Sequence, residues 1–400
     1  MSWFFLKVFK FFASLKLTVV TLTLSLILVF VGTIAQVKLG LYTAQQEYFS
    51  SMFVHWGPKG ADWKIPVFPG GYLLGAVLLL NLVAAHFDRW KPSVKKIGIS
   101  IIHAGLVVMF LGQFTTQMLQ IESHMLIPEG GASNYSQSDR RSELVVIDTT
   151  DPKKDKVVSI PDAVIAKHAK DGKEITHPDL PFALRVKNYM INSQPKFEGG
   201  EIKFDARPQA TAMDDRDVPA VTVEVVAGGA KKAEWPVSNW LMEEGLFANI
   251  ARGLGGRAAG LGGPRVFEFN GKKYLFGMRS QRFYKPFKLS LMDFKFDRYL
   301  GTGVAKNYSS DLILERPDTG EKREIHIRMN SPLRYGGETY YQGSFTRDER
   351  ATILQVVRNP SWLTPYIACV MVSLGLLWQF LSHLIKFMER RADEQSAVRK

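Results

Sequence analysis

Histidine is the residue type in this sequence best placed to bind a cofactor, and His103 is the most informative of the eight histidines. It lies seven residues into a stretch without charged side chains, roughly 9 Å along a helix from the start of that stretch. An ionisable ring at that depth in a membrane indicates a functional role, and imidazole is a common axial ligand of haem iron. A hydrogen bond to a neighbouring helix explains the position equally well.

Two further histidines, His86 and His383, lie two and three residues before the first charged residue that ends a similar stretch. An imidazole at a helix end fits among lipid headgroups, so a structural role competes with haem ligation at both positions. We keep both as secondary candidates for cofactor binding. His55 and His124 flank such stretches at the other end, where an interfacial structural role is the usual one.

The sequence lacks the motifs of the common soluble enzymes. It contains no phosphate-binding Gly-x-x-x-x-Gly-Lys, no Gly-x-Ser-x-Gly, no paired-cysteine metal motif and no Cys-x-x-Cys-His haem attachment site. The single cysteine, Cys369, excludes an internal disulfide and dithiol chemistry by this chain alone. We therefore predict no catalytic residue.

Four stretches without Asp, Glu, Lys or Arg are each long enough to cross a bilayer as a helix, which takes about 20 residues. Their lengths and the prolines near their starts predict four transmembrane α-helices and one large block between the third and the fourth. The expected order is a cytoplasmic arm at 1–16, spans at 17–35, 70–87, 97–118 and 362–385, an outer loop at 36–69, a cytoplasmic loop at 88–96, an extracytoplasmic domain at 119–361 and a cytoplasmic tail at 386–400.

Lys and Arg next to the spans set the orientation. The N-terminal arm, the loop after the second span and the C-terminal tail are all rich in basic residues, so the positive-inside rule places both termini in the cytoplasm. The large block is then extracytoplasmic, and we expect the protein to lie in the cell inner membrane. Much of the net charge of +13 lies at the inner membrane face, where it meets anionic lipid, and it implies no nucleic-acid partner.

The large block alternates apolar and polar residues in the manner of β-strands. Alternating runs occur at 144–147, 182–186 and 221–225, and turn residues separate them. Asn270-Gly271 lies between two such runs and predicts a tight hairpin, because both central residues of a type I′ turn need positive φ. We expect an all-β domain, either a sandwich or an open barrel-like sheet.

The end of this block carries a long motif, Asn-Ser-Pro-Leu-Arg-Tyr-Gly-Gly-Glu-Thr-Tyr-Tyr-Gln-Gly-Ser-Phe at 330–345, with Gln-Val-Val-Arg-Asn-Pro at 355–360. This motif resembles the ResB/CcsB family of cytochrome c biogenesis proteins. Shorter agreements occur at 32–36, 44–49, Asn81-Leu82 and His103-Ala104-Gly105. The layout of three spans, a large outer domain and a fourth span is also similar to that of the family.

The resemblance implies a role in system II of cytochrome c maturation. In that system a tryptophan-rich membrane partner of the CcsA/ResC type and this family carry haem b outward. They attach it to the Cys-x-x-Cys-His thiols of apocytochrome c, which thiol-reducing proteins keep reduced. The resemblance makes the histidine of the third span, here His103, a haem ligand opposed by a histidine of the partner. The partner's haem-presenting loop is not found in this sequence, so synthetase activity would need a second polypeptide.

Two other functions stay open at this point. The chain could be a bis-histidine b-type cytochrome for electron transfer, with His86 facing His103, or a membrane-anchored β-domain that only binds a partner. We expect no haem or metal site in the outer domain, because its histidines are dispersed. In the motif, we expect Arg334, Tyr335 and Tyr341 to serve folding or docking, because glycines and a proline mark their segment as a turn leading into a strand.

Overall fold

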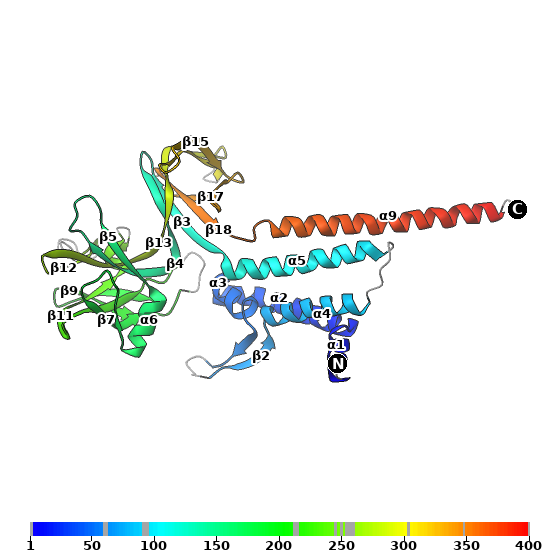
Figure 1. The fold of residues 1–400 in the computed structure, drawn as a ribbon, viewed down its shortest axis with the longest axis horizontal. Coiled ribbons are helices and arrows are strands. Elements are labelled where there is room, and N and C mark those ends of the chain that lie inside the picture. Colours follow the sequence, from blue (N-terminus) through cyan, green and yellow to red (C-terminus); the bar gives the residue numbers. More distant parts are fainter. Residues whose placement is uncertain are drawn as a thin grey trace. The chain divides into compact units, whose positions relative to one another are not determined.

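The computed structural model describes residues 3–58, 63–89, 96–210, 216–243, 246–248, 251–252, 261–301, 305–346 and 349–398. The chain divides into two compact units, whose elements are coloured along the sequence in Figure 1. The first unit comprises residues 1–121, 211–213 and 359–400, and we call it the helical unit. The second comprises residues 122–210 and 214–358, and we call it the β-rich unit.

The helical unit contains four helices that are long and apolar enough to cross a membrane, and this confirms the predicted helical part of the fold. Three of them are α2 (Leu15–Leu39), α4 (Gly71–Asp88) and α5 (Ile97–Leu119). The fourth, α9 (Thr364–Val398), continues as a helix well beyond the end of its apolar part. A shorter helix, α1 (Trp3–Phe12), precedes α2 and lies within the predicted N-terminal arm.

Asn81 of α4 holds the corner between α1 and α2. The chain breaks from helical geometry at Ser14, and the Asn81 amide donates to the carbonyls of Phe12 at 2.6 Å and Ser14 at 3.0 Å. Thr18 donates to the Asn81 side-chain oxygen at 2.6 Å. Carbonyls freed at a helix break need such donors in lipid, so Asn81 is a structural residue.

Helices α5 and α9 pack through small residues. Gly98, Gly105 and Gly112 are buried along one face of α5, seven residues apart. A Cβ atom at Gly98 would lie 2.7 Å from the Gly375 carbonyl oxygen, and one at Gly105 would lie 3.1 Å from that of Ala368. Residue numbers rise along α5 as they fall along α9, so the two helices are antiparallel with closely approaching backbones.

The segment between α2 and α4 is compact. It comprises α3 (Leu41–Ala44), the π-helix η1 (Gln45–Phe49) and a hairpin of β1 (Phe53–Trp56) and β2 (Ile65–Pro69). Its anchor is a small apolar cluster that holds Val54, with Leu28 of α2 and Leu74 of α4.

The β-rich unit contains a four-stranded sheet of order β11-β10-β7-β6, a ten-stranded sheet and the separate hairpin β8–β9. The main path of the large sheet is β15-β14-β13-β4-β3-β18-β17-β16, with β12 on β13 and β5 on β4. The strands are β3 (Ile121–Pro128), β4 (Ala132–Asp148), β5 (Lys156–Pro161), β6 (Glu174–Ile175), β7 (Ala183–Met190), β8 (Ser193–Glu198), β9 (Glu201–Ala206), β10 (Ala220–Ala227), β11 (Ala230–Ser238), β12 (Arg265–Phe269), β13 (Lys272–Arg298), β14 (Ala305–Arg316), β15 (Glu321–Arg328), β16 (Leu333–Tyr335), β17 (Glu338–Phe345) and β18 (Ala351–Arg358).

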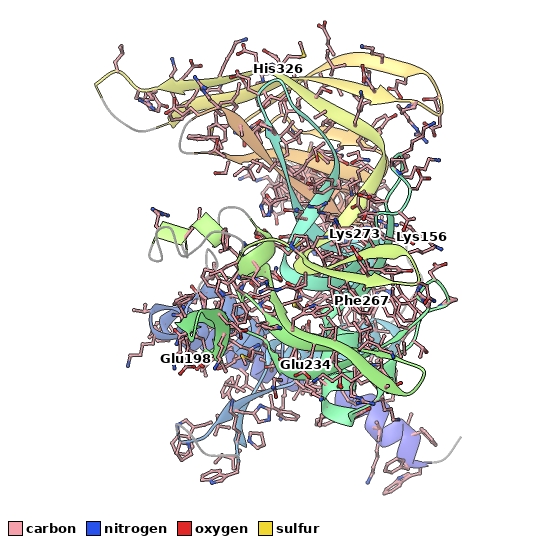
Figure 2. The ribbon with its side chains drawn as sticks, turned by 90° about the vertical axis from the view of Figure 1, so that its left-hand side faces the viewer. Lys156, Glu198, Glu234, Phe267, Lys273 and His326 are labelled. Carbon is pink, nitrogen blue, oxygen red and sulfur yellow. The ribbon has the colours of Figure 1, made fainter. Side chains whose placement is uncertain are left out.

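Two very long strands, β4 and β13, pair with each other, and β13 contributes to two separate cores. At one end, apolar side chains of β4, β5, β12 and β13 face those of β7 and β10, as in a sandwich. Phe267 of β12 belongs to this core (Figure 2). At the other end β13, β14, β15, β17, β18 and β3 enclose a second core. There the sheet curls until β15 meets β16, where Tyr335 donates to Glu321 at 2.5 Å.

The β-rich unit therefore confirms both expected forms, a sandwich and a nearly closed barrel-like sheet. The predicted Asn270-Gly271 turn connects β12 and β13 with φ of 53° and 72°. The all-β description needs one addition, because helix α6 (Asp162–Asp171) lies within this unit and α7 (Asn239–Met242) is a single turn. Asp162 in the first turn and left-handed Gly172 after the last are ordinary helix-end signals.

Candidate functional site

His86 and His103 come together at one end of the helical unit. His86 lies in the last turn of α4 and His103 in the second turn of α5. Only a short connection separates the two helices, and its residues 90–95 lie outside the described part of the chain. The end of α4 lies beside the start of α5, so the two rings meet at one depth.

The two imidazoles are at hydrogen-bond distance. Their Nδ1 atoms are 3.4 Å apart, their centroids are 5.6 Å apart and their planes cross at 74°. Both residues are half-buried. When both rings are neutral, one Nδ1 carries the proton and donates it to the other. The donating ring then has a free electron pair on Nε2, and the accepting ring carries a proton there.

This arrangement fits one metal ligand with one orienting partner. A metal-bound histidine normally donates its second N–H to an acceptor that fixes the ring, and the other histidine serves as that acceptor here. Because the 3.4 Å contact joins the two Nδ1 atoms, it leaves the donating ring with an unprotonated Nε2 that could bind a metal.

His103 faces α4 because of its place on α5. It lies two residues before Gly105, which is about 200° around an α-helix, so it points away from the glycine face that packs on α9. Helix α5 therefore packs on α9 through its glycine face and directs His103 toward α4.

His383, the other predicted candidate, lies elsewhere on the helical unit. It is exposed on α9, and its Nε2 is 2.7 Å from the side-chain amide nitrogen of Gln379. Gly98 of α5 is level with Gly375, so His383 lies roughly 20 Å from His103 along the helix axes. The structure thus groups His86 with His103 and leaves His383 apart.

Charged groups fix the backbone next to His86. Lys10 of α1 forms an ion pair with Asp88 at 2.5 Å, and Arg89 donates to the Ala13 carbonyl at 3.3 Å. These contacts tie the end of α4 to the α1–α2 corner. They hold the turn that carries His86 against its neighbours.

The remaining chemistry-bearing histidines do not cluster. His55 is exposed on β1, His326 pairs with Asp311 at 2.6 Å, and His124 pairs with Asp139. The hydrogen bond with Asp139 raises the pKa of His124. Among the described residues no group of three or more His, Cys, Asp or Glu could hold a metal ion.

The motif at 330–345 has an inward and an outward set of side chains. Glu338 accepts from Lys285 of β13 at 2.5 Å and from the hydroxyl of buried Tyr340 at 2.7 Å. Lys285 and Glu338 come from strands that are not neighbours in the sheet, so the pair joins β13 to β17 across the barrel-like core. Arg334 and Tyr341 are exposed instead.

The sequence prediction missed the glycine face of α5 and the pairing of Lys285 with Glu338. Only the first of these could have been recognised in the sequence. Small residues seven apart in α5 are a helix-packing pattern that the sequence already displays. Lys285 gave no local signal, since only the folding of β17 back onto β13 makes it the partner of Glu338. Tyr335 packs edge-on against Phe287 at 4.9 Å, in agreement with the folding role expected for it.

Comparison with known proteins supports the family resemblance of the motif at 330–345. The ResB-like family matches residues 267–352, which run from β12 through β17 into β18. Protein NrfI of Wolinella succinogenes is 36% identical over 102 residues, or 26% of this chain. The alignment spans 11% of the length of that relative. With its four apolar helices this is a multi-pass membrane protein, and its residues 267–352 are similar to the ResB-like family.

Proposed function

We propose that this protein is the haem-handling subunit of a system II cytochrome c synthetase. With a CcsA/ResC-type partner it would help to export haem b and attach it to Cys-x-x-Cys-His apocytochrome c outside the cytoplasm. The ResB-like segment supports a role in cytochrome c biogenesis in general. The observation that carries the finer proposal is the contact of His86 with His103 inside the predicted membrane span.

His103 is the proposed ligand and His86 the positioning residue. His103 lies deeper in its helix, whereas His86 is two residues from the charged side chain of Asp88. Haem bound here would supply an iron that accepts one imidazole nitrogen from this chain. His86 would accept the Nδ1 proton of His103 and so direct its Nε2 outward, and the partner would provide the opposing ligand.

The proposed orientation places this pair toward the cytoplasm. The basic arm, the 88–96 loop and the tail would face inward, and the β-rich unit would lie in the periplasm. Haem would enter the site from the inner side, which is where it is available for export. The thiol-reducing proteins would act on apocytochrome c, without contacting this chain.

The test is His103→Ala in the full chain co-expressed with its partner. Haem in the purified complex should fall below about a tenth of normal, with the protein and partner still assembled in the membrane. Added imidazole should restore part of the haem content, because it occupies the vacated position. The matched control is Ser100→Ala on the same helix, whose hydroxyl contacts the Lys96 carbonyl at 3.4 Å. Normal haem content and cytochrome c assembly in His103→Ala would contradict the proposal.

A bis-histidine b-type cytochrome is the second candidate, because the structure brings His86 and His103 side by side, although both could bind iron only after giving up their mutual hydrogen bond. It predicts stoichiometric haem in the chain expressed without a partner, with a low-spin absorption spectrum lost in both His86→Ala and His103→Ala. The synthetase subunit predicts stable haem only with the partner. A protein that is only a membrane-anchored binding module would hold none in either case.

A further inference from the structure

Helix α1 has a charged face and an apolar face. Lys7 and Lys10 lie three residues apart, and the Lys7 ammonium is 3.5 Å from the centre of the Trp3 ring on the same face. The opposite face follows the i, i+3, i+4, i+7 pattern of an amphipathic helix with Phe5, Val8, Phe9 and Phe12. The helix can therefore meet an apolar phase on one side and a polar phase on the other.

The rest of the chain leaves the apolar face of α1 largely uncovered. None of the ten residues of this fully described helix is buried. Phe5 is 61% exposed, and Val8 and Phe9 are 39% and 36% exposed. So many exposed apolar side chains within three turns mark a surface that another apolar phase covers.

Contacts with α4 set the depth of α1 relative to the spans. Asn81 holds the carbonyls of Phe12 and Ser14, where α1 ends and α2 begins. Lys10 reaches Asp88, the last residue of α4. Asn81 and Asp88 are seven residues apart, which is about 10 Å along the helix. Helix α1 therefore lies beside the last two turns of α4 and, as Figure 1 shows, is turned across the direction of α2 and α4.

That depth corresponds to the boundary between acyl chains and headgroups. An interfacial amphipathic helix buries its apolar face about 5–10 Å into this boundary and directs its lysines outward. Tryptophan is enriched at the same level, because its ring is apolar and its N–H is polar, and Trp3 fits this place. The position of α1 therefore favours lipid as the phase that covers its apolar face.

The charges of this segment match anionic headgroups. Residues 3–16 include three lysines and no acidic residue. Lys10 pairs with Asp88, whereas Lys7 and Lys16 are exposed and form no ion pair within the described part of the chain. Cations beside an apolar face favour a bilayer that contains anionic lipid over an apolar protein surface.

We propose that α1 is an interfacial helix of the leaflet at the His86 end of the bundle. Its apolar face lies among the acyl chains, and Lys7 and Lys16 bind anionic headgroups. The segment expected to form a cytoplasmic arm at 1–16 is then a membrane-bound element. This inference goes beyond the proposed function and does not depend on haem binding, because it rests on the faces, depth and charge of α1.

The test measures the depth of α1 with nitroxide labels on the full chain, in nanodiscs of phosphatidylcholine and phosphatidylglycerol. Cys369 is exposed within the apolar part of α9, so a label there is the reference for lipid. In a Cys369→Ala background, single labels are attached at Phe5→Cys and Lys7→Cys. A label at Lys232→Cys, on an exposed position of β11, is the reference for water.

Oxygen concentrates among acyl chains and a soluble nickel chelate stays in water, so the ratio of the two accessibilities reports depth. The ratio at position 5 should be close to that at Cys369 and roughly tenfold above that at position 232, with position 7 between them. A ratio at position 5 equal to that at position 232 overturns the proposal. A label at position 5 that is shielded from both reagents shows that a second copy of the chain or another protein covers this face, which also overturns it.

A second arm reads the charge of the neighbouring lipid. A bimane fluorophore at Phe5→Cys should be quenched more by nitroxide-labelled phosphatidylglycerol than by an equal amount of nitroxide-labelled phosphatidylcholine. Each lysine near the surface strengthens the attraction of anionic lipid about fivefold, so Lys7→Gln with Lys16→Gln should remove most of the difference. Lys38→Gln, in the last turn of α2, is the matched control and should leave it unchanged. Equal quenching by the two lipids before any lysine is changed overturns the headgroup assignment.

Discussion

The two units bury polar groups by different chemistry. In the helical unit the buried polar side chains of Thr21 and Asn81 bond to main-chain carbonyls. The β-rich unit buries hydroxyl and amide groups as well, but it also buries ion pairs, and Lys285 with Glu338 has side-chain exposures of only 6% and 14%. Arg279 with Glu143 is similar, at 8% and 4%.

The difference follows from the solvent of each unit. A lipid-facing helix bundle cannot recover the cost of charge separation from nearby water, so neutral hydrogen bonds and close backbone packing hold it together. A β-domain folded in water can bury an ion pair where further hydrogen bonds satisfy it, as Tyr340 does for Glu338. Removing one member of each kind of contact should therefore have effects of different size.

The largest effect is expected from Lys285→Met. It leaves the Glu338 carboxylate buried without a cation and should lower the free energy of unfolding by about 3–5 kcal/mol. Adding Glu338→Gln should restore most of the loss, because the amide still accepts from Tyr340. Chemical unfolding in detergent measures both. Lys156→Met is the control, since its pair with Asp179 is exposed and should contribute little to stability.

The next largest effect is expected from a change in the packing of two helices. Gly105→Leu would place its Cβ 2.9 Å from Val372 and should destabilise the α5–α9 pair by about 1–3 kcal/mol. Gly75→Leu on α4 has no atom within 4 Å of the new Cβ and should be tolerated. The stability of the two variants can be compared by unfolding them in increasing concentrations of a denaturing detergent. Equal stability of Gly105→Leu and Gly75→Leu would contradict close α5–α9 packing.

His86 should have an intermediate effect that sharpens its role. Loss of an orienting partner costs about 10- to 100-fold in affinity, so His86→Ala should bind haem weakly but retain more of it than His103→Ala. His86→Asn places a hydrogen-bonding group near the former Nδ1 and should recover part of the loss. Haem titration of the complex measures the affinity of His86→Ala, His86→Asn and His103→Ala. The opposite ranking would make His86 the ligand.

The smallest effect concerns pH and the exposed pair of His124 with Asp139. The folded pKa of His124 is raised, so its contribution to stability is complete below the unfolded value of about 6.5 and is lost as pH rises through the folded pKa. The thermal midpoint should therefore fall slightly more between pH 6 and pH 8 in the wild type than in His124→Gln. Parallel curves would show that the pair contributes nothing measurable.

Much of the architecture was predictable because its signals are local. Four stretches without charge predict four helices, since lipid tolerates neither charge nor an unpaired backbone. Asn270-Gly271 predicts its hairpin because few other residues accept positive φ. The position of His103 inside a span was also evident, and its role as a ligand remains a proposal.

By itself, the sequence determined which segments are helices or strands and where polar residues fall within them, because these depend on neighbouring residues. Tertiary structure alone decided that His86 meets His103, that the glycine face of α5 meets α9 about 260 residues later, and that Lys285 reaches Glu338. It also decided that, among the described strands, β9 pairs with β8 alone. Such pairings depend on the packing of whole elements, since residues distant in the chain carry no local record of their partners.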